Sequence, residues 1–236
     1  MNEAILQLKD IHSHIGSHHI LQGVSLTIKK GVPTTILGRN GAGKTSTLRT
    51  IMGLNPLTSG DITFLGDSIG GKKPYEIARK GIGFVSENKV VLSELTVEEN
   101  FRLAMINESE KSWQLMEKVW ELFPDIKKFW KAKAGNLSGG QKQMVSIARS
   151  FVDERPLLLI DEPAKGLAPI IVDHLGEVLK QIKDKTTVVL VEQNFHMASL
   201  VGEQYFILDD GRTVHQGKME DLVLNEEVKK KYLGIG

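Results

Sequence analysis

Residues 38–45 read GRNGAGKT, which fits the phosphate-binding pattern G-x-x-x-x-G-K-[ST]. The glycines allow backbone N–H groups to close around phosphate oxygens. Lys44 supplies a positive charge to the β- and γ-phosphates, and the Thr45 hydroxyl can bind Mg²⁺. Residues 34–37 predict a buried strand before this loop, and residues 46–52 predict a helix after it. The residues expected to contact a nucleoside triphosphate here are Gly38, Arg39, Asn40, Gly41, Ala42, Gly43, Lys44, Thr45 and Ser46.

A second glycine-rich segment, residues 137–141, reads LSGGQ and precedes a predicted helix over residues 142–152. Serine is a preferred N-cap residue, and the paired glycines expose backbone N–H groups at the positive end of the helix. The segment therefore predicts a second anion-binding helix end in the same chain. The residues expected to contact nucleotide there are Ser138, Gly139, Gly140 and Gln141.

Residues 157–162 read LLLIDE, an apolar run that ends in two acids. Such a run predicts a central parallel strand that delivers Asp161 and Glu162 to the carboxyl edge of a sheet, where ligands bind. We expect Asp161 to hold Mg²⁺ together with Thr45, and Glu162 to act as the general base on the attacking water. A merely solvated Glu162 at the strand end is the alternative. Pro163, which ends the strand, favours the catalytic interpretation.

The order of these three segments resembles that of the ATP-binding-cassette (ABC) ATPases, the motor subunits of membrane transporters, over residues 5–234. The resemblance implies an α/β fold with a P-loop NTPase core, an antiparallel β subdomain and an inserted helical subdomain. It implies ATP and Mg²⁺ as cofactors, with Lys44 neutralising phosphate charge in the transition state. It also implies a head-to-tail pair, in which each LSGGQ segment covers the ATP bound by the other chain's phosphate loop.

Hydrophobic patterning predicts one domain over residues 1–236, with a helical subdomain at about residues 88–150. A helix over residues 96–105 begins with a capping box of Thr96 and Glu99. An apolar stripe at helical spacing follows, with two interpretations: packing within the helical subdomain, or a groove for a partner. The stripe consists of Trp113, Met116, Val119, Trp120 and Phe123. The other expected elements are strands over 5–9, 24–28, 61–65, 82–86 and 187–191, helices over 170–182 and 195–201, a hairpin of 205–208 with 213–216, and two short C-terminal helices.

Composition limits the classes of partner. The chain has 236 residues, 41% of them hydrophobic, and a formal net charge of +1, which gives no basic field for nucleic acid. It contains no cysteine, as is usual in a reducing cytoplasm. Neither a signal pattern at the N-terminus nor an apolar run of about 18 residues is present. We therefore expect a protein that reaches a membrane only by docking onto partners from the cytoplasmic side.

Several departures from the common ABC pattern indicate a subfamily. Glu87 stands where most members have glutamine, and Gln193 stands where most have a switch histidine. With residues 166–169 (GLAP), 191–194 (VEQN), 76–83 (EIARKGIG) and 225–234 (NEEVKKKYLG), the chain resembles the second ATPase of branched-chain amino acid importers. Glu87 can still bind Mg²⁺ and the Gln193 amide can donate to the γ-phosphate, but it cannot carry a charge. A non-hydrolysing cassette therefore stays an alternative.

One further departure concerns the base. The residue before Gly16, normally an aromatic on which adenine stacks, is Ile15. Either the neighbouring His14 turns in as a substitute, or ATP is held mostly by its phosphates. The nearby histidines are expected on an exposed turn between strands without carboxylates around them, which does not favour a metal site. They are His12, His14, His18 and His19.

The resemblance implies transmembrane permease subunits and a second ATPase subunit as partners, at the cytoplasmic face of the membrane. The extracytoplasmic solute-binding protein would be met only indirectly. The apolar residues 90–92 either pack inward or receive a cytoplasmic helix of the permease. A soluble ABC ATPase of DNA repair or translation is the second hypothesis. The sequence leaves open the solute (branched-chain amino acids, urea or short amides) and whether the pair is a homodimer or a heterodimer.

Overall fold

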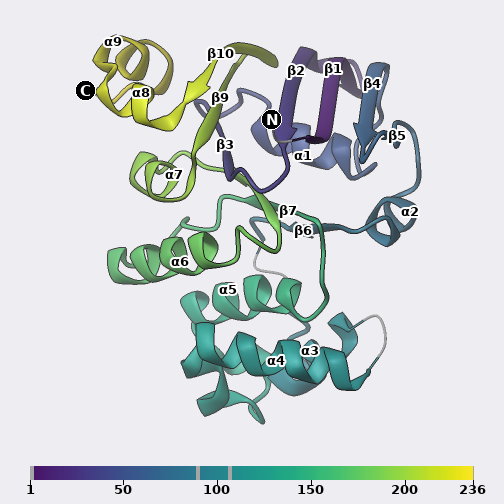
Figure 1. Cartoon of the computed structure of the whole chain (residues 1–236), viewed down its shortest axis with the longest axis vertical. Coiled ribbons are helices and arrows are strands. Elements are labelled where there is room, and N and C mark those ends of the chain that lie inside the picture. Colours follow the sequence, from purple (N-terminus) through teal and green to yellow (C-terminus); the bar gives the residue numbers. More distant parts are fainter. Residues whose placement is uncertain (1–2, 89–90, 106–107, 236) are drawn as a thin grey trace.

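The computed structural model describes residues 3–88, 91–105 and 108–235. Two sheets and a group of helices make up this part of the chain (Figure 1). Within it, no helix combines the length and the hydrophobicity that crossing a bilayer requires.

The first sheet is antiparallel, in the strand order β2-β1-β4-β5. Its strands are β1 (Ala4–Ile15), β2 (His18–Lys29), β4 (Ser59–Phe64) and β5 (Asp67–Ser68). The predicted β layer is confirmed, but β1 and β2 are far longer than expected. They continue to a tight hairpin turn, in which Gly16 has a φ of 60°. The histidines therefore lie in paired strands rather than on a separate turn.

The second sheet has the order β10-β9-β3-β8-β7-β6. Five strands are parallel, and β10 pairs antiparallel with β9. The strands are β3 (Thr34–Leu37), β6 (Ile82–Val85), β7 (Leu157–Asp161), β8 (Thr187–Val191), β9 (Gln204–Asp209) and β10 (Arg212–Lys218). Every residue of β3, β7 and β8 is buried, as expected for central parallel strands covered on both faces. The carboxyl ends of these three strands lie at one edge of the sheet, which positions the site.

Helices cover the parallel sheet and close the chain. They are α1 (Lys44–Ile51), α2 (Pro74–Arg79), α6 (Pro169–Gln181), α7 (Phe195–Val201), α8 (Met219–Leu224), α9 (Glu226–Val228) and the π-helical turn η4 (Lys229–Leu233). The predicted C-terminal helices are thus present. Together with the mixed sheets, they confirm the α/β fold class.

The described residues between β6 and β7 form mainly helices, which lie at the lower end of Figure 1. Its elements are α3 (Val97–Ala104), α4 (Glu110–Leu122), η1 (Pro124–Phe129), η2 (Ala134–Asn136), α5 (Gly139–Ala148) and η3 (Arg149–Phe151). In the predicted stripe, Met116, Val119 and Phe123 are buried. They belong to one apolar cluster that continues into β7, β8 and α6. The stripe is therefore packing, not a partner groove.

The helix of the LSGGQ segment begins three residues earlier than predicted, at Gly139. The Ser138 hydroxyl accepts the Gln141 N–H, and the Gln141 side chain accepts the Ser138 N–H in return. This reciprocal capping box satisfies two donors and fixes the helix start ahead of the glycine pair. The helix ends at Ala148 and continues as the short 3₁₀ turn η3.

Candidate functional site

The phosphate loop connects β3 to α1. Gly41 and Gly43 have φ values of 82° and 98°, in the left-handed region that favours glycine. A Cβ at Gly38 would lie 2.3 Å from the Leu208 carbonyl oxygen, so the loop can pass under β9 only with glycine there. The Lys44 side chain is buried, and its Nζ donates to the carbonyl oxygens of Gly38 (2.9 Å) and Arg39 (3.0 Å). This burial lowers the pKa of Lys44.

The two residues proposed to hold Mg²⁺ meet directly. The Thr45 hydroxyl donates to Asp161 Oδ1 at 2.9 Å, across the edge where α1 begins and β7 ends. The pKa of Asp161 is raised to about 6, mainly by burial, and the negative charges of Glu162 and Glu87 contribute to the rise. The Thr45 hydrogen bond opposes this effect because it favours the charged carboxylate. The pair therefore presents oxygen ligands in a site that disfavours an uncompensated negative charge.

Glu162 adopts a left-handed backbone with a φ of 44°, which is uncommon for a residue other than glycine. Its N–H donates to the Val191 carbonyl at 2.9 Å, which ties the residue to the end of β8. Its carboxylate is nearly buried, with Oε1 3.8 Å from Lys44 Nζ. The proposed base is thus held at the strand tip and points toward the phosphate loop.

Gln193 joins the same group from the loop after β8. Its Nε2 donates to Glu162 Oε1 at 3.0 Å and also to Asn40 Oδ1 in the phosphate loop. The structure therefore brings together the three residues that the sequence assigned to catalysis, which are Lys44, Glu162 and Gln193.

Glu87 lines the pocket at the phosphate loop, where it pairs with a lysine rather than with the other predicted metal ligands. The pocket is lined by Ile20, Asn40, Gly41, Gly43, Lys44, Thr45, Ser46, Glu87, Glu162 and Lys165. Glu87 Oε1 accepts a hydrogen bond from Lys165 Nζ at 2.5 Å, and Lys165 Nζ also lies 3.8 Å from Glu162 Oε2. Magnesium binding by Glu87 stays a prediction.

The remaining predicted contacts lie outside this pocket. Ile15 is 47% exposed at the end of β1 and does not line it. His14 is engaged elsewhere, because its Nδ1 is 3.1 Å from Thr58 Oγ1 and its ring stacks on His19 at 4.1 Å. The segment from Ser138 to Gln141 does not line the pocket either.

The histidine cluster does include a carboxylate, contrary to expectation. His12 Nε2 lies 3.4 Å from Asp10 Oδ1, and His12 Nδ1 lies 3.0 Å from His19 Nε2. Because β1 is irregular between Leu8 and His12, Asp10 is brought beside this ring. Among the described residues, no group of three or more histidines, cysteines or acids is arranged to hold a metal ion.

Comparison with known proteins identifies the family. A family model described as ABC transporter matches residues 21–165, which is more than half of the chain. The chain belongs to the ABC transporter ATPases. It is an ATP hydrolase of the transporter type, and its fold and motif order agree with that assignment.

Two curated relatives are similar to this ABC ATPase over nearly their whole length. The high-affinity branched-chain amino acid transport ATP-binding protein BraG of Pseudomonas aeruginosa is 38% identical, over 98% of this chain and 100% of the relative. The probable branched-chain amino acid transport ATP-binding protein LivF of Archaeoglobus fulgidus is 33% identical, over 92% of this chain and 93% of the relative. A solved dimeric ATP-binding cassette in a post-hydrolysis state, bound to ADP and Pi, is 26% identical. It has a TM-score of 0.80 and covers 91% of this chain and 98% of its own.

Sequence reasoning on this ABC ATPase missed two charged residues at the site. Lys165, three residues after Glu162, pairs with Glu87. A basic residue so close to Asp161 and Glu162 in the sequence was a signal that could have identified it. Glu192 precedes Gln193, and its carboxylate is almost fully buried. The pKa of Glu192 is raised to about 7, mainly by burial, and the charge of Glu162 contributes to the rise. The sequence carried no signal for that burial beyond the apolar strand before it.

Two of the apolar residues 90–92 of the cassette belong to the described part of the chain, and they lie in different environments. Val90 lies outside the described residues. Val91 packs against the apolar cluster of the helical segment, whereas Leu92 is exposed. Asn100 fixes Leu92, because it accepts the Leu92 N–H at 2.8 Å and donates to the Leu92 carbonyl at 3.0 Å. Inward packing is thus confirmed for Val91, whereas docking of a permease helix at the exposed Leu92 stays a prediction.

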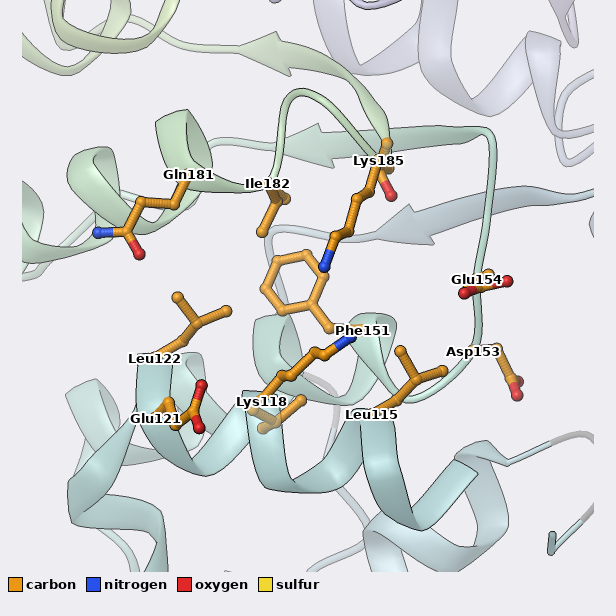
Figure 2. Close-up of a pocket in the computed structure, with 12 residues that line it drawn as sticks. Leu115, Lys118, Glu121, Leu122, Phe151, Asp153, Glu154, Gln181, Ile182 and Lys185 are labelled. Atoms are coloured by element: carbon orange, nitrogen blue, oxygen red, sulfur yellow. The ribbon is translucent and has the colours of Figure 1, made fainter. Parts of the chain in front are cut away.

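A separate pocket of about 280 Å³ lies between α4, η3 and the turn after α6. Leu115, Leu122, Phe151 and Ile182 form its apolar walls, and Lys118 and Lys185 also line it (Figure 2). None of the residues that the sequence assigned to nucleotide or metal lines it. This pocket is therefore separate from the predicted ATP site at the phosphate loop.

Proposed function

We propose that this ABC ATPase energises a membrane importer of branched-chain amino acids. The convergence of Lys44, Glu162 and Gln193 beside the phosphate loop carries the catalytic part of the proposal. The solute class is supported by the names of the relatives that match the chain at 38% and 33% identity.

ATP and Mg²⁺ are the proposed cofactors. Thr45 Oγ1 and Asp161 Oδ1 supply oxygen ligands, which Mg²⁺ prefers, and a buried carboxylate with a raised pKa is suited to receive a cation. Bound there, Mg²⁺ would neutralise charge on the β- and γ-phosphates. Glu87 would join these ligands if Lys165 released it. The donor set of the site therefore fits the ion.

The proposed division of labour follows from the contacts. Lys44 exchanges the two loop carbonyls for phosphate oxygens and offsets their charge. Glu162 accepts a proton from the attacking water, and the Gln193 amide, which contacts both Glu162 and the phosphate loop, donates to the γ-phosphate. The nearly buried position of Glu162 keeps bulk water away from that proton transfer.

We propose that the LSGGQ segment acts on a second ATPase subunit. Ser138 and its neighbours sit at the start of α5 and do not line their own chain's phosphate pocket. A head-to-tail pair would bring them over the partner's ATP. The N-terminal N–H groups of α5 would then bind its phosphates.

The permease is the other proposed partner. A groove of about 430 Å³ lies between the core and the helical segment, and its lining includes Phe84, Ala104, Arg149 and Arg155. It follows β6, which leads directly to Glu87 and the exposed Leu92. A cytoplasmic helix of the permease docked there would hold this chain at the membrane periphery. It would also connect the membrane gate to the catalytic loop.

The experiment that tests the proposal is hydrolysis in proteoliposomes containing the chain and the transmembrane subunits encoded beside it. Solute-binding protein loaded with leucine, isoleucine or valine should stimulate ATP turnover, and a Lys44→Ala chain should abolish it. Stimulation by urea or short amides alone would contradict the solute class. Failure of the chain to associate with these subunits would contradict the importer assignment.

A further inference from the structure

The Glu192 side chain connects the loop after β7, which carries Glu162, to the loop after β8, which carries Gln193. Only 2% of its surface is exposed. Its Oε1 accepts the Ala164 N–H at 2.8 Å, from the loop after β7. Its Oε2 accepts the N–H groups of Gln193 and Asn194, both at 3.1 Å, from the loop after β8. One carboxylate thus satisfies three backbone donors from two separate segments of the chain.

These donors stand next to the residues that do the chemistry. Ala164 is two residues after Glu162, and the Gln193 backbone carries the amide that donates to Glu162 Oε1 at 3.0 Å. The Glu192 backbone is itself anchored, because its N–H donates to the Ile36 carbonyl of β3 at 3.2 Å. A rigid strand end therefore sets the position of both loops through one side chain.

We infer that Glu192 is a positioning residue, which holds the Gln193 amide against Glu162 and so sets the geometry of the base before hydrolysis. The inference rests on the proposed roles of Glu162 and Gln193. Both carboxylate oxygens of Glu192 are engaged by backbone N–H groups, so its proposed effect runs through the backbones that it fixes.

The chemistry of the site requires a carboxylate of this length. All three partners are N–H donors, and an ionised carboxylate offers acceptors only. A glutamine would turn an NH₂ group toward at least one of these donors and leave it unpaired. An aspartate is one methylene shorter and cannot span both loops from the same backbone position. Buried donors without partners are costly, so either change should let the loops shift.

The buried charge has an identifiable electrostatic setting. Glu162 faces it with a like charge from the loop after β7, and Lys44 interacts with it favourably from α1. The three N–H bonds also favour the ionised form. A carboxylate at this position provides acceptors for three N–H groups that would otherwise have no partner.

The test is single-turnover ATP hydrolysis with the full-length chain in excess, for the parent, Glu192→Gln and Glu192→Asp. We expect the hydrolysis rate to fall about tenfold or more in Glu192→Gln, with ATP affinity changed less than about threefold. Hydrogen exchange at the amides of Ala164, Gln193 and Asn194 should accelerate in both variants. Glu192→Asp should keep part of the rate, because it retains the charge and some of the bonds.

Asn194→Ala is the matched control. The Asn194 side chain caps α7 by accepting the Met197 N–H at 3.1 Å and does not touch the Glu192 carboxylate. This variant should lose thermal stability but keep its hydrolysis rate within about twofold of the parent. If it loses as much rate as Glu192→Gln, general loosening of α7 explains the effect and the inference is overturned.

Other outcomes separate the inference from the proposed function. A folded Glu192→Gln chain with the parent's rate, or with unchanged exchange at the three amides, overturns the positioning role. A loss confined to ATP affinity does so as well. A parent chain that binds no ATP and hydrolyses none refutes the proposed function instead.

Discussion

Gln193 Nε2 lies 3.0 Å from Glu162 Oε1, so a neutral amide donates directly to the proposed general base. The same amide group donates to Asn40 in the phosphate loop. An imidazole at this position can protonate and carry a positive charge toward the γ-phosphate, which an amide cannot. We therefore expect the hydrogen-bonding role to be preserved here and charge stabilisation in the transition state to be reduced.

We therefore expect Gln193→His to increase ATP turnover by the isolated chain. A protonated imidazole would stabilise transition-state charge that the amide leaves uncompensated. Steady-state phosphate release at saturating Mg-ATP measures the change, with Gln193→Ala as the control for loss of the side chain. Turnover that is already fast in the parent and indifferent to both substitutions would show that the amide is no handicap.

Glu162→Gln should retain ATP binding and lose most turnover. The amide keeps the shape of the side chain beside Lys44 but cannot accept the proton of the attacking water. The loss should be on the order of 10²–10⁴ in rate. With ATP no longer consumed, the paired state should persist, and sedimentation with Mg-ATP should show a dimer. Unchanged turnover would remove Glu162 from the role of base.

Base selectivity should be weak. Ile15 is exposed at the end of β1, and His14 is already engaged with Thr58 and His19, so no stacking partner for adenine is ready from this pair. ATP and GTP affinities should lie within about tenfold, or roughly 1.4 kcal/mol. Ile15→Tyr should tighten ATP binding, with Ile15→Leu as the control. A strong adenine preference in the parent that disappears in His14→Ala would assign the contact to His14.

Stability should depend on pH through Glu192. Its pKa in the folded chain is raised from 4.5 to about 7, so between these values the folded state binds the proton more tightly than the unfolded state. The resulting stability is fully present below pH 4.5 and is lost as pH rises through about 7. From about pH 5.5 to about pH 8 the loss should be on the order of 2 kcal/mol.

Urea unfolding at the two pH values measures this dependence, with Glu192→Gln as the comparison. The variant has no titrating group at this position, so its stability should fall less than that of the parent over the same range. Asp161, whose raised pKa acts in the same direction, is present in both chains. Equal pH dependence in the two chains would show that Glu192 does not titrate in this window.

The sequence predicts the parts of the site that depend on local pattern. The phosphate loop, the acids at the end of β7 and the start of α3 each lie within one short segment, so spacing alone identifies them. The meeting of Thr45 with Asp161 also follows from the rule that parallel strands end at one edge.

The sequence could not predict the contacts between residues that are far apart along the chain. Glu192 and Ala164 are 28 residues apart in sequence, and their hydrogen bond depends on how two loops lie after adjacent strands. The pairing of Lys165 with Glu87 likewise depends on β6 and β7 being neighbours. The early start of α5 shows a different limit, because the Gln141 side chain completes a cap that glycine propensity argues against.

At Glu162, the side chain that the proposed catalysis needs requires a left-handed backbone that lowers the stability of the fold. A glycine there would adopt the same φ of 44° without steric cost, and the chain would be relieved of strain on the order of 1–3 kcal/mol. That chain would lack the carboxylate beside Lys44. Random mutagenesis selected only for heat resistance should therefore favour Glu162→Gly, and selection for transport should remove it.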